Sequence, residues 1–264
     1  MIIDSHVHVV SSDQESYPLA PVDLPNGAWY LDRPVDVSDL SSALDAVGVD
    51  AAVLVQAKGA YDYDNSYVMN AASSSKRFTS VGVADPKLAD SVERLRVAGL
   101  HGARLFDIPL GTHAGLAESI EACCRNGIVA VPTAMLEAAS MVADGAASNP
   151  GAVVAVDHCF FAALDDPDDR DLLQALFVQL PNVHFKVTSH VLLHCGDPVA
   201  AADWLVGTFG AGRLLWGSDF PQTPDASYRE LLDLARRATV NFDQGQRTRF
   251  FGGTALSLWP ELGS

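Results

Sequence analysis

The stretch from Val153 to Thr188, VVAVDHCFFAALDDPDDRDLLQALFVQLPNVHFKVT, contains the repeating unit from which the fold can be predicted. It begins with a run of small and β-branched apolar residues, Val153 to His158, which is typical of a buried strand. Apolar residues then recur at helical spacing from Asp168 to Leu180. After the turn residues Pro181 and Asn182, a second β-branched run extends from Val183 to Thr188. A strand, a helix and a strand in this order predict a parallel βαβ unit.

The same unit repeats along the chain. From the second apolar run onward, the runs start on average about 27 residues apart, the length of one βα unit. Eight units predict a closed (β/α)8 TIM barrel, with residues 1–264 as a single domain. The alternative is a doubly wound open sheet, but the sequence has no Gly-rich phosphate-binding turn after an early strand. The other predicted strands are Ile2–His8, Ala51–Gln56, Thr79–Ala84, Gly102–Phe106, Ile128–Pro132 and Arg213–Ser218.

Composition narrows the classes of partner. The 264 residues are 48% hydrophobic, enough for a sizeable core, and carry a formal net charge of −16. An acidic chain repels phosphate backbones and anionic membrane surfaces, so we expect a small-molecule substrate and no nucleic-acid or membrane partner. The N-terminal MIIDSHVHVV has no basic leader, and the four cysteines do not form a disulfide framework. Both features favour a cytoplasmic protein.

One connection is much longer than the others. It extends from Val9 to Val37, directly after the first predicted strand. In a barrel it would lie at the carboxyl ends of the strands, where long loops usually serve function. We therefore interpret it as a lid. Its aromatic residues Tyr17, Trp29 and Tyr30 fit either a wall of the barrel mouth or a subunit contact in a homo-oligomer.

Two histidines lie at the end of the first predicted strand. His6 and His8 are two residues apart, so on a strand their side chains project to the same side, together with Asp4. Barrel active sites are built at the carboxyl ends of the strands. We therefore expect both imidazoles in the active site. The alternative is a pair of structural histidines.

Two more strand ends carry polar residues. The segment Trp216 to Pro221, WGSDFP, places Asp219 after the eighth strand, which is adjacent to the first in a closed barrel. His158 lies at the end of the sixth strand, whose inward alternation is expected to run through Val154 and Val156. The alternatives are a helix-cap role for Asp219 and a structural role for His158. Three histidines and an aspartate could ligate a divalent metal, or could hold a carbonyl and activate water directly.

These segments together resemble a known family. The sequences I-D-S-H-V-H, D-H, F-K-V-T, W-G-S-D-F-P and G-G-T-A-L-S-L-W-P are similar to those of the amidohydrolase superfamily. More narrowly, they resemble its amidohydrolase 2 branch, the group of 2-pyrone-4,6-dicarboxylate lactonase and the sugar lactonases. The resemblance extends over essentially the whole chain, and it too implies a TIM barrel.

The resemblance implies a reaction and a role for each residue. His6 and His8 match the family's H-x-H pair, His158 its strand-six histidine and Asp219 its strand-eight aspartate. Lactonase chemistry is the hydrolysis of a small cyclic ester. Asp219 would then be the general base that takes a proton from water, and the histidines would polarise the ester carbonyl, with His158 facing the developing oxyanion.

The chain also departs from the metal-rich branches of the superfamily. Those branches place a carboxylated lysine or a glutamate on strand four and a histidine on strand five. Here strand four has Arg104 to Phe106 and strand five has Val131 to Thr133, so a binuclear site is not expected. A mononuclear Zn or Mn site of His6, His8 and Asp219 stays open beside metal-free catalysis.

Residues at other strand ends are candidates for substrate contact. They are Arg104, His190, Gln56, Lys58 and Thr133, each with a structural alternative, such as an internal ion pair for Arg104. A substrate with two carboxylates would require several arginines at the mouth. No second basic residue follows Arg104 closely, so the dicarboxylate lactone itself is not expected.

Two further functions compete with lactone hydrolysis. One is a metal-dependent decarboxylase of the same branch, which the missing histidine on strand five disfavours. The other is a barrel that binds a small ligand without turning it over. We expect His101, His113, His184 and His194 to be structural and Lys186 to form an internal salt bridge.

Overall fold

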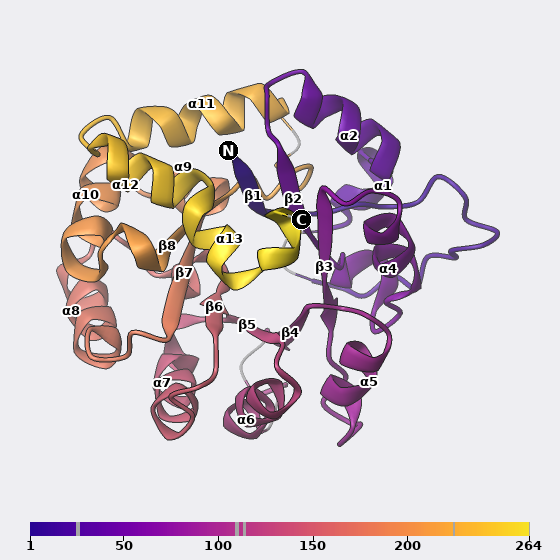
Figure 1. Cartoon of the computed structure of the whole chain (residues 1–264), viewed down its shortest axis with the longest axis horizontal. Coiled ribbons are helices and arrows are strands. Elements are labelled where there is room, and N and C mark those ends of the chain that lie inside the picture. Colours follow the sequence, from indigo (N-terminus) through magenta and orange to yellow (C-terminus); the bar gives the residue numbers. More distant parts are fainter. Residues whose placement is uncertain (25–26, 109–110, 113–114, 224, 264) are drawn as a thin grey trace.

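Eight parallel strands form the centre of the molecule. The computed structural model describes residues 1–24, 27–108, 111–112, 115–223 and 225–263. The strands pair in sequence order, each with the next, and the helices surround them (Figure 1). The (β/α)8 TIM barrel predicted from the sequence is confirmed. The strands are β1 (Ile3–Val7), β2 (Ala51–Val55), β3 (Phe78–Val83), β4 (Gly102–Asp107), β5 (Val129–Ala134), β6 (Val154–Val156), β7 (Val183–Thr188) and β8 (Leu214–Gly217).

The barrel closes through hydrogen bonds between the end of β1 and the residues that follow β8. The backbone N–H of Asp219 donates to the carbonyl of His6 at 2.8 Å, and that of His8 donates to the carbonyl of Phe220 at 2.8 Å. The contact between β5 and β6 is short, with the single register pair Ala130 and Val154. Closure of the barrel and placement of the strand-end residues therefore depend on the same hydrogen bonds.

The helices follow the strands in alternation. They are α1 (Trp29–Asp32), α2 (Val37–Asp45), α3 (Lys58–Tyr61), α4 (Ser66–Ser73), α5 (Ser91–Val97), α6 (Leu116–Asn126), α7 (Ala139–Ser148), α8 (Pro167–Phe177), α9 (Ser189–His194), α10 (Pro198–Phe209), α11 (Tyr228–Ala238), α12 (Gln244–Thr248) and α13 (Thr254–Leu258). Side-chain oxygens begin several of them: Asp36, Asp166, Asp197 and Ser227 each accept backbone N–H bonds at an N-cap. Among the helices of the described residues, none is long and apolar enough to cross a membrane.

Apolar side chains pack on both faces of the sheet. One cluster lies between the strands and the surrounding helices. The other fills the barrel interior with residues such as Val53, Val131 and Leu215, and extends to Trp259. The C-terminal segment with α13 crosses one end of the barrel (Figure 1). The two clusters are thus the two faces of one sheet. The assignment of residues 1–264 to one domain stays a prediction.

The long connection after β1 lies partly against the barrel. Trp29 and Tyr30 are buried, and the rings of Tyr17 and Tyr67 lie 5.0 Å apart. Trp29 and Tyr30 thus belong to the core of the protein, and Tyr17 packs against it. Pro25 and Asn26 lie outside the described residues, and the role of the connection as a lid stays a prediction.

The strand bounds agree closely with the sequence-based ones, with one consequential exception. The run Val183–Thr188 matches β7 in full, and β2 ends one residue before the predicted Gln56. By contrast, β6 ends at Val156 and does not reach His158. The residues after Val156 turn sharply, which changes where their side chains point.

We predict that Gly217→Ala destabilises the protein at the barrel closure. A Cβ at Gly217 would lie 2.7 Å from Cβ of His6 and 3.2 Å from its backbone nitrogen. Overpacking of this kind costs about 1–3 kcal/mol of the free energy of unfolding. Urea denaturation measures it.

The matched control is Gly207→Ala on α10, where a Cβ would meet nothing within 4 Å. Replacing glycine by alanine inside a helix stabilises by about 0.5–1 kcal/mol. Equal unfolding midpoints for the two variants would contradict the tight contact between β8 and β1.

Candidate active site

The structure brings together the four residues expected at the catalytic end of the barrel. His6 Nε2 lies 3.2 Å from His8 Nε2. Oδ1 of Asp219 lies 3.5 Å from His6 Nε2 and 3.4 Å from His8 Nε2. Ligand atoms of His6, His158 and Asp219 all lie within 4.8 Å of one another. All four residues are buried.

Asp4 does not share the side of β1 on which the histidines lie. The pairing of β1 with β2 shifts register between Asp4 and Val7, so the strand contains a bulge-like irregularity. Such an insertion reverses the alternation of side chains. Asp4 therefore faces α11, where the hydroxyl of Tyr228 donates to its Oδ2 at 2.6 Å. The expectation that Asp4 projects with His6 and His8 is wrong.

Asp4 instead holds the backbone of the site. Its Oδ1 accepts the N–H of His6 at 3.0 Å and that of Ser218 at 2.9 Å. Burial raises the pKa of this carboxyl, although its hydrogen bonds oppose the shift. One side chain thus joins the bulge of β1 to the residue before Asp219.

His158 reaches the site through a left-handed turn. Residues His158 to Phe161 all have positive φ, between 49° and 62°. This conformation costs about 1–2 kcal/mol for each non-glycine residue. Ala155 packs in the barrel interior, whereas Val154 and Val156 lie on the helix-facing side. The predicted inward alternation of β6 is therefore wrong by one residue.

As a result, the side chain that enters the barrel directly after β6 is that of Asp157, which sequence reasoning did not assign to the site. Its Oδ1 accepts from His6 Nδ1 and Lys186 Nζ, each at 3.0 Å. Its Oδ2 accepts from Arg104 Nε at 3.0 Å and from the Thr133 hydroxyl at 2.6 Å. Both oxygens of this fully buried carboxylate are therefore paired twice.

These partners decide the ionisation of Asp157. Burial raises its pKa, but the charges of Lys186 and Arg104 and the hydrogen bond from His6 lower it more, so that its pKa lies well below the ordinary value. The expected internal salt bridge of Lys186 is confirmed, and Asp157 is its partner. An ionised carboxylate can only accept hydrogen bonds, so the proton between it and His6 belongs to Nδ1 of His6.

His8 is held in the same tautomer. Its Nδ1 lies 2.7 Å from the carbonyl oxygen of Val55, which also can only accept. Burial lowers the pKa of His6 well below its ordinary value, so this imidazole is neutral at neutral pH. In neutral form, His6 and His8 both present a lone pair at Nε2. In that form neither Nε2 donates a hydrogen bond, and the polarisation of an ester carbonyl by these histidines stays a prediction.

Three acceptor atoms consequently face one another: Nε2 of His6, Nε2 of His8 and Oδ1 of Asp219. Within the described part of the chain, Oδ1 of Asp219 is buried without a hydrogen-bond partner. Burial raises the pKa of Asp219, but His158 and His8 lower it more, which keeps the carboxylate ionised. In a tetrahedral site with bonds of ~2.1 Å, neighbouring ligand atoms lie roughly 3.4 Å apart. The observed separations fit a divalent cation.

His158 differs from the other two imidazoles in its partner. Its Nδ1 lies 2.7 Å from Oγ1 of Thr188, a hydroxyl that can donate or accept. Burial lowers the pKa of His158 well below the ordinary value, so the ring is neutral. His158 can therefore present either an N–H or a lone pair at Nε2.

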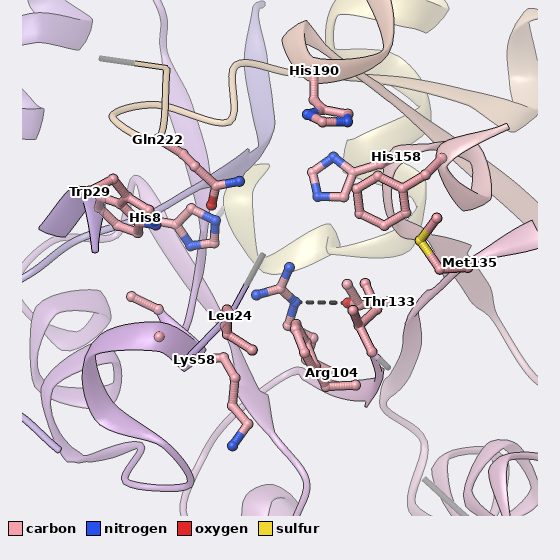
Figure 2. A pocket seen from close by; sticks show the side chains of 15 residues that line it. His8, Leu24, Trp29, Lys58, Arg104, Thr133, Met135, His158, His190 and Gln222 are labelled. Carbon is pink, nitrogen blue, oxygen red and sulfur yellow. Dashed lines mark hydrogen bonds between the residues drawn. The ribbon is translucent and has the colours of Figure 1, made fainter. Parts of the chain in front are cut away.

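A cavity of about 330 Å³ lies above these residues. His8 and His158 line it, whereas His6 and Asp219, which are 0% and 1% exposed, lie beneath the lining. Figure 2 shows the imidazoles of His8 and His158 on opposite sides, with the guanidinium of Arg104 between them and lower in the view. The apolar lining comes from Leu24, Trp29, Ala57, Gly59, Phe106, Ile108, Met135 and Phe161.

The predicted substrate-contact residues divide into two groups. Arg104, His190, Lys58 and Thr133 line the cavity. Gln56 does not: its Nε2 donates to the backbone carbonyls of Asp62 and Asp64, at 3.0 and 2.9 Å. Its side chain supports the loop after β2, so its position does not favour substrate contact.

The remaining histidines lie away from the three acceptors. His101 lies near Glu261, 3.5 Å away, in the C-terminal segment. The Nδ1 of His184 lies 3.3 Å from the carbonyl of Val154. His194 stacks on His190, with ring centroids 4.1 Å apart. His113 lies outside the described residues.

The missed residue Asp157 had a signal in the sequence. It directly precedes His158 within an apolar run, and the expected salt bridge of Lys186 in a buried strand requires a buried acid. The aromatic residues of the cavity wall had no such signal, because Phe106 and Phe161 are equally typical of core residues.

Comparison with known proteins places this geometry in a family. The amidohydrolase family model matches residues 3–260, and a search of curated proteins finds no match. A Burkholderia multivorans amidohydrolase with bound zinc is 23% identical, with a TM-score of 0.78 over 98% of this chain and 99% of that one. A probable 2-pyrone-4,6-dicarboxylic acid hydrolase from Acinetobacter baumannii, with citric acid bound, is 18% identical, with a TM-score of 0.77 over 98% and 99%.

The fold also occurs in a protein of different activity. A 2,6-dihydroxybenzoate decarboxylase from Rhizobium is 14% identical, with a TM-score of 0.59 over 98% of each chain. At these identities the solved structures show the fold alone. The family match, in contrast, spans nearly the whole chain and includes all four residues that meet at the carboxyl ends of β1, β6 and β8. The protein belongs to the amidohydrolase family.

Proposed function

We propose that this chain is a hydrolase that opens a small cyclic ester. The observation that carries the proposal is the buried, ionised Asp219, whose Oδ1 lacks a partner among the described residues and faces two imidazole lone pairs. This group lies directly beneath a cavity of small-molecule size. It combines a proton acceptor with a cation site, which are the two elements of water activation.

One divalent ion, Zn or Mn, fits the proposed site of His6, His8 and Asp219. When bound, such an ion would lower the pKa of water and polarise a carbonyl. The Nδ1 of each histidine is held by a hydrogen bond, as is usual for histidine ligands. The zinc in the Burkholderia relative supports this proposal.

The chain's own residues account for the proton transfers. Asp219 takes a proton from the water that attacks the ester carbonyl. His158 donates from Nε2 to the developing oxyanion while Thr188 donates to its Nδ1. The proton held by Asp219 then reaches the leaving oxygen, which completes ring opening.

Lactone specificity is supported by the nature of the cavity and by one relative. The lining is mostly apolar and suits a compact organic ring, and the Acinetobacter relative is described as a hydrolase of a pyrone. The decarboxylase relative favours a second candidate, a metal-dependent decarboxylase. A barrel that only binds a ligand is the third. The cytoplasmic location and the homo-oligomeric state stay predictions.

We predict that the purified protein binds one equivalent of Zn²⁺ or Mn²⁺ after removal and resupply of metal, measured by elemental analysis. His6→Ala and His8→Ala should lose it, because each removes one of the three facing acceptors. At a free metal concentration of 100 Kd, the folded state gains about 2.7 kcal/mol. His101→Ala, far from these acceptors, is the control. Full metal binding by His6→Ala would refute the proposed ligand set.

We predict that Asp219→Asn lowers kcat for a hydrolysed lactone by about 10² to 10⁴, the usual contribution of a general base. Ring opening is followed by proton release across a panel of sugar and aromatic lactones. Substrate binding should persist because the shape of the side chain is preserved. A variant that retained most of its kcat, under metal saturation, would exclude Asp219 as the base. Release of carbon dioxide from an aromatic acid would favour the decarboxylase instead.

We predict that Asp157→Asn weakens metal binding by about 10- to 100-fold, because a neutral amide no longer fixes the tautomer of His6. Removing the carboxylate also leaves Lys186 and Arg104 buried without a counterion, which costs about 3–5 kcal/mol of stability. Metal competition and urea denaturation measure the two effects. Asp171→Asn on the exposed face of α8 is the control and should change neither.

A further inference from the structure

We propose that the cavity takes a planar, aromatic or conjugated lactone with no more than one carboxylate, and that Arg104 receives this carboxylate. The inference rests on the proposed function for the reaction and on the cavity wall for the substrate. It separates this chain from enzymes built for dicarboxylates. Three features of the wall support it. The charge of Lys58 is paired with another residue, Arg104 has one nitrogen available for a ligand, and aromatic rings lie on different sides of the cavity.

Lys58 lines the cavity with its stem, but its charge is used elsewhere. Its ammonium pairs with the carboxylate of Asp62. It also lies 3.7 Å from the ring centroid of Tyr63, on the same loop. Figure 2 shows the ammonium directed away from the histidines. Binding a carboxylate would require breaking both contacts, so Lys58 offers no ready anion subsite.

Arg104 is partly engaged but keeps one open side. Its Nε donates to Asp157 and Thr133, at 3.0 and 2.8 Å, and Nη1 lies 3.4 Å from the carbonyl of Gln56. No hydrogen bond from Nη2 is found to any described residue, and the guanidinium points toward the centre of the cavity (Figure 2). An arginine fixed in this way can donate to one carboxylate without moving.

The rest of the described wall offers a second carboxylate no cation, only neutral polar groups such as the amide of Gln222 and the hydroxyl of Thr133. Apart from Lys58 and Arg104, the described lining contains no lysine or arginine. A carboxylate placed among apolar side chains without a partner loses its hydration for no compensating contact. A dicarboxylate would therefore bind with one end not paired to a cation.

Aromatic side chains shape the space above Arg104. The ring of Phe106 lies 5.2 Å from the guanidinium carbon of Arg104. On another side, Phe161 packs against His158, with ring centroids 4.7 Å apart. Trp29 lies beside His8, 5.6 Å between centroids. Flat rings of this kind favour a flat ligand by stacked or edge contacts.

Binding of simple aromatic acids tests the inference without requiring turnover. Benzoate, isophthalate and benzamide share one ring and differ in charge, and calorimetry gives their Kd. We expect benzoate to bind at least about 10-fold more tightly than isophthalate and than benzamide, since a second carboxylate, or the loss of the first, leaves a buried group unpaired. Isophthalate binding as tightly as benzoate, or no benzoate binding at millimolar concentration, overturns the inference.

Two variants locate the effect. Arg104→Gln should remove the preference for benzoate over benzamide. Because Arg104 also pairs with Asp157, a second variant avoids its surroundings: Met135 is 37% exposed and lines the cavity. Met135→Lys adds a cation to the apolar wall and should raise isophthalate affinity by about 10-fold, while the uncharged Met135→Gln should not. No gain from the lysine overturns the inference.

Turnover distinguishes this inference from the proposed function. If a 2-pyrone with one carboxylate is opened and 2-pyrone-4,6-dicarboxylate is not, both hold. Faster opening of the dicarboxylate overturns the inference and leaves the hydrolase proposal intact. If no lactone is opened while benzoate is still preferred to isophthalate, the hydrolase proposal fails and the selectivity of the cavity stands.

Discussion

The carboxylate of Asp157 is the charge on which the catalytic end of the barrel depends. It is fully buried and accepts from His6, Lys186, Arg104 and Thr133. An unpaired carboxylate at this depth would cost several kcal/mol, and so would either cation alone. Each group is therefore tolerable only because the others are present. The network joins β4, β5, β7 and β1 around the residue after β6, across the weakly paired β5–β6 edge.

The same network controls the chemistry of the site through one proton. Because Asp157 can only accept, it holds the proton of His6 on Nδ1, and the carbonyl of Val55 does the same for His8. Two lone pairs then point at the ionised Asp219. Such an arrangement is repulsive until a cation enters. The arrangement of these three acceptors beneath the cavity is therefore compatible with a divalent ion.

Sequence reasoning could predict the barrel because strands buried on both faces read as apolar runs with turn residues between them. It also found His6, His8, His158 and Asp219, since strand ends converge whatever the details of each strand. It failed where a single residue changes which side chains of a strand face the barrel interior. The register shift of β1 turns Asp4 outward, and the three-residue β6 directs Asp157, rather than its neighbours, into the barrel. Strands this short contain too few residues for the pattern of side chains to show which of them face inward.

The tautomer of His158 is less constrained than those of His6 and His8, and the reason is chemical. A carboxylate and a carbonyl impose one tautomer, whereas the hydroxyl of Thr188 accepts either. Transfer of the ring proton from Nε2 to Nδ1, with the hydroxyl rotated to accept instead of donate, replaces a hydrogen-bond donor by a lone pair at Nε2, directly on the cavity wall. One barrel can thereby stabilise an oxyanion or supply a further ligand without moving its backbone. Thr188 is the last residue of β7, so the hydroxyl that can bond either tautomer lies on a rigid strand. It is beside the strained turn that holds His158 in place.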